Sequence, residues 1–347
     1  MSRRAVAFFF LLLVLLLIGC VISPRRTVVS SGGGGGTATG KLYVTNDSGN
    51  SIVRFDNAFT ATGNVAPAAN ISGASTQLAN PKYIFLDAAA DRLFVANSSG
   101  SNILIFETVS TKTGNVAPSR TIGSGSLATP TDVTLDEGRD LLYVADTNTI
   151  LEFTPASTVN GIIVPVRILN PGFTPGAILI DAANDRLFVA NPTSNSINIY
   201  DAASSLPSGG IVPTRQLSGA ITQLGQPFGL QIDSAGRLVV SNAAPTPSIT
   251  VYTNAAGVNG NVAPAANISG ANTNLAGPTQ MTINNTAPAG ELFVADPFGG
   301  HVPVFASIST LANAQNIAPT RDINGANTTL ASGGAATARG VAIDTTR

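Results

Sequence analysis

A short apolar run that ends in a polar residue recurs six times along the chain. Each copy is an apolar triplet, then a small residue, then Asn or Asp. The copies occupy residues 42–46, 93–97, 142–146, 187–191, 238–242 and 292–296. Their first residues, all leucine, lie 45 to 54 positions apart. A period of about 50 residues indicates one supersecondary unit that is copied in series.

The second repeat shows what this unit contains. Apolar runs rich in β-forming residues cover 83–87, 92–96 and 103–106, and a weaker run covers 120–122. Polar turn residues separate them. The first three runs are almost continuously apolar, as expected of strands that pack on both faces. Four short antiparallel strands in about 50 residues are typical of one blade of a β-propeller.

The two ends of the chain distinguish a closed ring from an open solenoid. The first repeat begins at residue 40 and lacks its innermost strand, whereas residues 339–344 match an innermost strand at the other end. The other innermost strands are expected at residues 84–87, 133–136, 178–181, 230–233 and 281–284. A solenoid would need polar capping units instead, and ring closure removes exposed strand edges. We therefore predict an all-β, six-bladed propeller of four-stranded blades over residues 40–347, closed by pairing of the C-terminal strand with the first blade.

The segment before the repeats predicts where in the cell the protein is located. Arg3 and Arg4 precede an apolar run over residues 5–18. At about 1.5 Å per residue the run reaches roughly 21 Å, short of the ~30 Å core of a bilayer, so a secretory signal peptide is favoured over a membrane span. The run ends in Leu17-Ile18-Gly19-Cys20, which resembles a bacterial lipobox. This resemblance implies that Cys20 becomes the lipid-modified first residue of the mature protein.

Three regions follow from this assignment. We expect a lipoprotein signal peptide at 1–19, the lipidated Cys20 with a flexible tether at 20–39, and the propeller at 40–347. The tether includes five consecutive glycines at 32–36, a composition typical of a flexible coil. The predicted location is the bacterial cell envelope, on a membrane-anchored lipoprotein that faces the periplasm or the cell surface.

Composition narrows the class of partner. Charged residues are 11% of the chain and the formal net charge is −1. Because no basic stripe with interleaved aromatic residues is present, we expect no nucleic-acid partner. Cys20 is the only cysteine and His301 the only histidine, which excludes an internal disulfide framework and a multi-histidine metal site.

Two segments carry a resemblance to a known family. Tyr43-Val44-Thr45-Asn46 is similar to the YVTN repeat signature of surface-layer and lactonase-like propellers, and residues 130–146 are similar to an NHL repeat. The resemblance covers about residues 40–347 and implies the propeller fold. Such propellers have binding, scaffolding and hydrolytic roles, so the fold alone does not select among them.

Two rings of positions are expected at one face of the propeller, around its channel, because strand direction alternates within a blade. The starts of the innermost strands form the inner-strand ring, Tyr83, Asp132, Ala177, Gly229, Gln280 and Gly340. The ends of the second strands form the turn ring, Asn46, Asn97, Asp146, Asn191, Asn242 and Asp296. His301 follows two glycines and is expected near the same face. The candidate channel-mouth binding residues are Tyr83, Asp132, Gln280, Asn97, Asp146, Asp296 and His301.

Two interpretations of the turn ring stay open at this point. Its oxygens are of the kind that bind calcium. Asn and Asp at the start of a hairpin also bond their own backbone, and a feature present in every repeat is typical of blade construction. Calcium-dependent lactonases gather Glu, Asn and Asp at the channel, whereas the inner-strand ring here has one acid, Asp132. A catalytic His301 would need a nucleophile beside it, and the sequence has no G-x-S-x-G motif to supply one. We therefore predict no catalytic residue, metal site or cofactor, with calcium the one ion left open.

These observations favour a lipid-anchored envelope propeller that acts as a non-enzymatic binding or scaffold module. Its expected partners are the membrane, through the anchor, and an envelope protein, a glycan or a small molecule at one face. The alternative is a lactonase-like or other propeller hydrolase that uses the channel mouth. A surface spacer that binds nothing in its channel is a third hypothesis.

Overall fold

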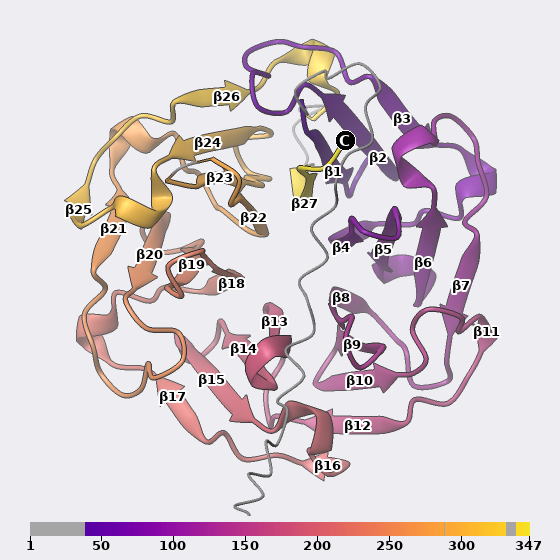
Figure 1. The fold of residues 1–347 in the computed structure, drawn as a ribbon, viewed down its shortest axis with the longest axis horizontal. Helices are drawn as coiled ribbons and strands as arrows, with labels where there is room; N and C mark the ends of the chain where they lie inside the picture. The colour runs from indigo at the N-terminus through magenta and orange to yellow at the C-terminus, as the bar shows by residue number, and fades with distance from the viewer. Residues whose placement is uncertain (1–38, 288, 331–337) are drawn as a thin grey trace, which may run out of the picture. The chain divides into compact units, whose positions relative to one another are not determined.

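The computed structural model describes residues 39–287, 289–330 and 338–347. The chain divides into a unit of residues 1–37 and a unit of residues 38–347. The first unit, with the predicted signal peptide and Cys20, lies outside the described residues. In the second, six β-sheets are arranged in a ring around a central axis (Figure 1). The six-bladed, all-β propeller predicted from the repeat is therefore confirmed.

Each blade contributes four successive strands, counted from the axis outwards. The innermost strands are β27 (Ala338–Asp344), β4 (Pro81–Asp87), β8 (Pro130–Asp136), β13 (Ile178–Asp181), β18 (Pro227–Ile232) and β22 (Met281–Asn284). The second strands are β1 (Lys41–Asn46), β5 (Arg92–Asn97), β9 (Leu141–Asp146), β14 (Arg186–Asn191), β19 (Leu238–Asn242) and β23 (Glu291–Val294). In this order the strands belong to blades 1 to 6.

The outer half of each blade is built in the same way. The third strands are β2 (Ser51–Asp56), β6 (Asn102–Glu107), β10 (Thr149–Phe153), β15 (Ser196–Asp201), β20 (Ser248–Tyr252) and β24 (Val302–Ala306). The fourth strands are β3 (Ala69–Ser72), β7 (Arg120–Gly123), β12 (Arg167–Asn170), β17 (Arg215–Leu217), β21 (Ala266–Ser269) and β26 (Arg321–Ile323). The 3₁₀ turns are η1 (Ala74–Thr76), η2 (Ser98–Gly100), η3 (Val109–Thr111), η4 (Ala182–Asn184), η5 (Ala203–Ser205), η6 (Ala220–Thr222), η7 (Ala271–Thr273), η8 (Ile308–Thr310) and η9 (Ala326–Thr328).

The ring closes where the two ends of the propeller meet. The C-terminal β27 pairs antiparallel with β1, with Lys41 opposite Asp344 and Val44 opposite Val341. The last strand of the chain thus becomes the innermost strand of blade 1, as predicted. The pairing leaves blade 1 with the same strand order as the others.

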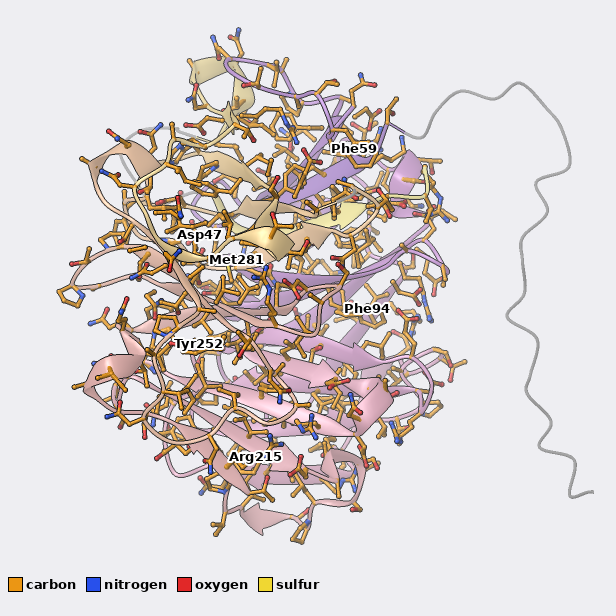
Figure 2. The ribbon with its side chains drawn as sticks, turned by 60° about the vertical axis from the view of Figure 1, so that its left-hand side comes forward. Asp47, Phe59, Phe94, Arg215, Tyr252 and Met281 are labelled. Carbon is orange, nitrogen blue, oxygen red and sulfur yellow. The ribbon has the colours of Figure 1, made fainter. Side chains whose placement is uncertain are left out.

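The near-continuous apolar runs are explained by the packing between blades. Along β5, Leu93 and Val95 join the apolar cluster between blades 1 and 2, while Phe94 and Ala96 join the one between blades 2 and 3. Alternate residues of one strand therefore enter two different cores, because successive side chains point to opposite faces. Figure 2 shows side chains filling the spaces between sheets, with Phe94 and Tyr252 among those that are buried.

A feature absent from the prediction is a fifth strand at the rim. The loop between the third and fourth strands of a blade reaches back and pairs in parallel with the fourth strand of the preceding blade. These strands are β11 (Gly161–Ile162), β16 (Gly209–Gly210) and β25 (Asn313–Gln315). In the other three blades the same contact is a single bridge, at Gly63, Gly114 and Gly260. The four-stranded blade is thus correct for each repeat, and neighbouring repeats are also joined at the rim.

Arginine side chains reinforce these junctions. Arg120, at the start of β7, donates from Nη1 to the carbonyls of Ala156 and Val159 in the next blade, at 2.9 and 2.8 Å. Its Nε donates to Glu107 at 3.0 Å. Equivalent bonds to the following blade are made by Arg54, Arg167, Arg215 and Arg321. A guanidinium with several fixed donors suits this bridging role.

Candidate functional site

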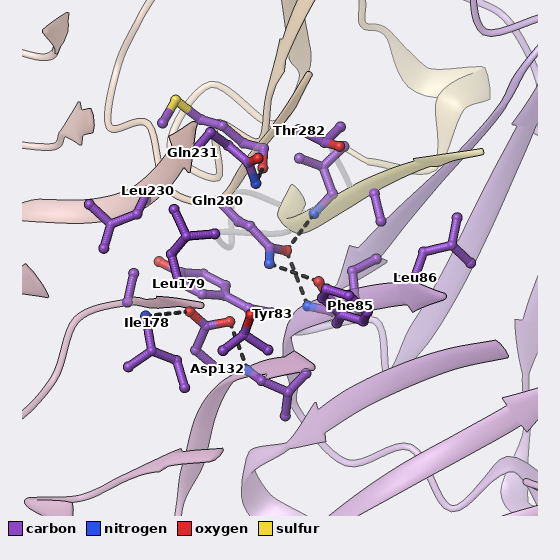
Figure 3. A pocket seen from close by; sticks show the side chains of 18 of the residues that line it. Tyr83, Phe85, Leu86, Asp132, Ile178, Leu179, Leu230, Gln231, Gln280 and Thr282 are labelled. Atoms are coloured by element: carbon purple, nitrogen blue, oxygen red, sulfur yellow. Dashed lines mark hydrogen bonds between the residues drawn. The ribbon is translucent and has the colours of Figure 1, made fainter. Parts of the chain in front are cut away.

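The central channel holds a cavity of about 180 Å³ that is lined by the innermost strands (Figure 3). Three of the seven candidate binding residues line it: Tyr83, Asp132 and Gln280. The other four, Asn97, Asp146, Asp296 and His301, do not line it. The inner-strand ring therefore lies at the channel, and the turn ring lies away from it.

Asp132 lies near the start of β8, the innermost strand of blade 3, and is 3% exposed. One carboxylate oxygen accepts the N–H of Val133 and the other accepts the N–H of Ile178 in blade 4, both at 2.8 Å. Burial raises the pKa of Asp132 to about 8, against these two backbone bonds, which lower it. Its carboxyl group therefore joins two blades through hydrogen bonds, and its raised pKa lies close to neutral pH.

Gln280 spans the channel from blade 6. Its Oε1 accepts the N–H of Ile84 in blade 2 at 3.1 Å and the N–H of Val341 in blade 1 at 2.9 Å, and its Nε2 donates to the Ile84 carbonyl at 2.8 Å. Figure 3 shows these bonds as dashed lines. Innermost strands have an unpaired edge that faces the axis, and buried backbone groups need partners. Gln280 supplies them for two strands at once.

Tyr83 crosses the channel from blade 2. It packs with Ala177, Leu224 and Leu230, in the apolar cluster between blades 4 and 5. Burial raises the pKa of its hydroxyl, to which Thr279 is hydrogen bonded. The ring therefore fills this end of the channel and the hydroxyl stays neutral at physiological pH.

The backbones of blades 1 and 2 also approach closely beside the channel. A Cβ at Gly340 would lie 2.5 Å from the Lys82 carbonyl oxygen, so only glycine fits there. The Thr45 hydroxyl accepts the Gly340 N–H and donates to that same carbonyl, both at 2.7 Å. Blades 1 and 2 are thus tied together beside Gln280.

Three turn-ring side chains, those of Asn97, Asp146 and Asp296, bond the loop that leads into the innermost strand of their blade. Asn97 Oδ1 accepts the N–H of Ala79 at 2.6 Å. The Asp146 carboxylate accepts the N–H groups of Ala128 and Thr129. The Asp296 carboxylate accepts those of Ala276, Gly277 and Gly299. In each case the oxygens serve backbone donors of the same blade.

His301 is buried, with 6% of its surface exposed. Its Nδ1 bonds the Asp322 carboxylate at 2.8 Å, and its Nε2 lies 3.9 Å from Asp296 Oδ2. Burial lowers the pKa of His301, but the bond to Asp322 and the charges of Asp322 and Asp296 outweigh it, and the net shift is upward. The imidazole ties the β23–β24 turn to β26.

A charged cluster beside the channel was not predicted. Asp47, which directly follows the turn ring in blade 1, is buried and accepts from Arg339 Nε at 3.2 Å and Lys82 Nζ at 3.4 Å. Arg339 and Lys82 each precede an inner-strand ring residue. That adjacency in the sequence was the signal that could have placed the three groups together.

Within residues 39–287, 289–330 and 338–347, no group of three or more His, Cys, Asp or Glu side chains is placed to hold an ion. No helix among these residues is long and apolar enough to cross a bilayer.

Comparison with known proteins identifies the fold. No family model matches the sequence, and no curated protein matches it. Among solved structures, the nidogen/laminin complex has a chain that aligns with a TM-score of 0.60 and 14% identity, over 88% of this chain and 98% of that one.

Two bacterial structures align over slightly less of the chain. Hydrazine synthase from Kuenenia stuttgartiensis aligns with a TM-score of 0.51 and 13% identity, over 80% of this chain and 79% of that one. A protein of unknown function from Desulfotomaculum acetoxidans aligns with a TM-score of 0.49 and 10% identity, over 79% and 78%. At such identities the likeness to the nidogen/laminin and hydrazine synthase structures extends to the fold alone, and the six sheets of this chain define that fold as a six-bladed β-propeller.

Proposed function

We propose that this protein is a lipid-anchored propeller of the bacterial envelope that acts as a non-enzymatic binding or scaffold module. The anchor rests on the lipobox-like sequence that ends in Cys20. Multiple acyl chains would hold the protein stably at a membrane, since each buried methylene contributes about 0.8 kcal/mol. The repeats are assigned to the YVTN/NHL type on their sequence signatures.

One observation carries the binding or scaffold part of the proposal. The polar atoms at the channel mouth are committed to the protein's own backbone: both oxygens of Asp132, and both polar atoms of the Gln280 amide. A general acid or base must reach its substrate directly or through one water. Side chains that hold neighbouring blades together serve stability and leave ligand binding to other parts of the surface.

A hydrolase that uses the channel mouth is the second candidate, and one observation favours it. Asp132 lines the cavity and has a pKa of about 8, which is in the range useful for proton transfer at neutral pH. A screen of lactones and phosphotriesters decides between the two functions. Turnover above background by the full chain that is lost in Asp132→Ala would overturn the non-enzymatic proposal.

The anchor is tested by expressing the full chain and Cys20→Ser in a bacterial host. We expect the wild type to be extracted from membranes with detergent and to carry an acyl mass on its N-terminal peptide. The Cys20→Ser variant should lack that mass and leave the membrane fraction. Wild-type protein without an acyl mass would contradict the anchor.

A further inference from the structure

Three open hollows lie side by side on the face that carries the turn ring. One lies between the turns of blades 3 and 4 and measures about 530 Å³, and the next, between blades 4 and 5, measures about 560 Å³. Thr193, in the β14–β15 turn, lines both. A third, of about 370 Å³, shares Ala244 and Pro245 with the second. Because adjacent hollows share lining residues, the three are neighbours across the turns of blades 3 to 5, and together they are called the groove.

The groove is uncharged. Of the described residues, none that lines the three hollows is Asp, Glu, Lys, Arg or His. The corresponding turns of the other half of this face contain Asp47 and His301, with Lys82 and Arg339 beside them. A ligand of the groove is therefore selected without ion pairs, by hydrogen bonds and apolar contact.

Four of the asparagines that line the groove are held by a hydrogen bond to their side-chain oxygen. The Oδ1 of Asn195 accepts the Gln226 N–H at 2.8 Å, and that of Asn148 accepts the Thr174 hydroxyl at 2.6 Å. Asn170 and Asn191 likewise accept backbone N–H groups through Oδ1. An amide whose oxygen is fixed in this way has a fixed Nδ2 as well. These Nδ2 groups have no hydrogen-bond partner in the part of the chain that the structure describes.

Two aromatic rings accompany these donors. Phe173 lines the hollow between blades 3 and 4, and Phe228 lines the one between blades 4 and 5. Both rings are partly exposed. Aromatic faces are apolar and carry a negative quadrupole, so they attract the C–H faces of a flat ligand.

We propose that this groove binds a neutral oligosaccharide chain. Sugar hydroxyls accept from fixed amide donors, and the C–H faces of the rings pack on Phe173 and Phe228. An anionic ligand would need the cations that the groove lacks. A peptide recognised by strand addition would need a free sheet edge, whereas the groove crosses hairpin turns. The inference rests on the proposed binding function and names its ligand class.

The test is calorimetric titration of the detergent-solubilised full chain with maltotetraose, cellotetraose and tetra-N-acetylchitotetraose. A heparin tetrasaccharide and an uncharged tetrapeptide serve as comparison ligands. We expect at least one neutral sugar to bind, with a Kd of about 0.1–1 mM, and neither comparison ligand to bind. Binding of heparin or the peptide in preference to every neutral sugar would overturn the ligand class.

Matched variants localise the site. Thr193 is exposed, makes no side-chain hydrogen bond among the described residues and lines two hollows, so Thr193→Arg should block them without loss of an internal contact. We expect at least a tenfold loss of sugar affinity. Ser99 is exposed at the equivalent turn position of blade 2, and Ser99→Arg should leave affinity unchanged. Equal affinity in all three proteins would overturn the site.

Failure of this inference is distinguishable from failure of the proposed function. If no neutral sugar binds, the ligand class is wrong, while acylation at Cys20 and the absence of turnover are measured separately. If a sugar is bound and cleaved, with products seen by chromatography, the groove stands and the non-enzymatic proposal falls.

Discussion

The two halves of the turn-ring face use polar side chains differently. Over blades 6, 1 and 2, Gln280 and Asp47 join elements that are distant in sequence, and His301 joins the β23–β24 turn to β26 within blade 6. Over blades 3 to 5, Asp132 also joins two blades, but asparagines of the groove such as Asn195 use their oxygen internally and make no hydrogen bond through Nδ2 within the described residues. The first half holds the ring together near its closure, and the second half offers hydrogen bonds to a ligand.

The location of this difference has a physical reason. Blade 1 is assembled from both ends of the propeller, so β27 is joined to β1 by strand pairing and not by a hairpin turn, and its place in the ring depends on noncovalent ties. Asp47 and Thr45 join blade 1 to Lys82 of blade 2, and Gln280 links both of these blades to blade 6. A side chain whose polar atoms are already bonded within the protein is poorly suited to bind an external ligand.

The largest effect is expected from Gln280→Ala. This change leaves the buried N–H groups of Ile84 and Val341 without partners, at about 1–3 kcal/mol for each group. We expect the free energy of unfolding to fall by about 2–4 kcal/mol in urea titrations. Gln231→Ala removes one bond, to the Met281 carbonyl, and should cost about 1 kcal/mol. Equal losses would contradict the special role of Gln280.

A smaller loss is expected from Asp47→Ala. It removes the buried acceptor that Lys82 and Arg339 share, and both of these cations are partly exposed, so we expect about 2 kcal/mol of destabilisation. Thr193→Ala, on the neutral half, should stay within about 0.5 kcal/mol. Thermal unfolding of the two variants measures the contrast, and a Thr193→Ala loss as large as that of Asp47→Ala would remove it.

The raised pKa of Asp132 determines how its contribution to the free energy of unfolding changes with pH. Its folded pKa of about 8 lies above the ordinary value, so the unfolded chain releases this proton first. Its contribution to the free energy of unfolding should therefore fall as pH rises from about 4 to about 8. Urea titrations across this range should show a steeper fall for the wild type than for Asp132→Ala. Parallel profiles would mean that Asp132 is ionised in the fold.

The smallest effect is expected at His301, because burial lowers its pKa while two nearby carboxylates raise it. Because its folded pKa is raised, its stabilising contribution is complete below the ordinary histidine pKa and is lost as pH rises through the raised value. His301→Ser introduces the residue found at the equivalent position in blades 1, 4 and 5 (Ser51, Ser196 and Ser248). The wild type should lose its advantage over this variant with rising pH, and a constant difference would argue against the charged pair.

The fold was predictable because its signal is apolar and periodic. Residues such as Leu93 and Phe94 recur in every blade since each strand supplies two cores. The rim strands were not predictable in this way, because β11 and β16 are two-residue pairings of exposed loop residues. Their partners lie about 40 residues back in the chain and leave no hydrophobic pattern.

The same distinction applies to the candidate site. Tyr83, Asp132 and Gln280 were placed at the channel by strand position alone. Their partners were not predictable, because Ile84 and Gln280 are 196 residues apart. The groove was missed because it joins turns from three repeats. Its signal was present as uncharged stretches at residues 170–176, 191–195, 222–226 and 242–248.

Hydroxyl-radical footprinting of the full chain in its own envelope tests the central claim most directly. Phe173 and Phe228 report on the neutral half, and Phe298, which is 73% exposed, reports on the charged half. We expect oxidation of Phe173 and Phe228 to be reduced in the envelope relative to purified protein, with Phe298 unchanged. Protection of Phe298 alone, or of none of the three, would contradict a binding module that uses the face of blades 3 to 5.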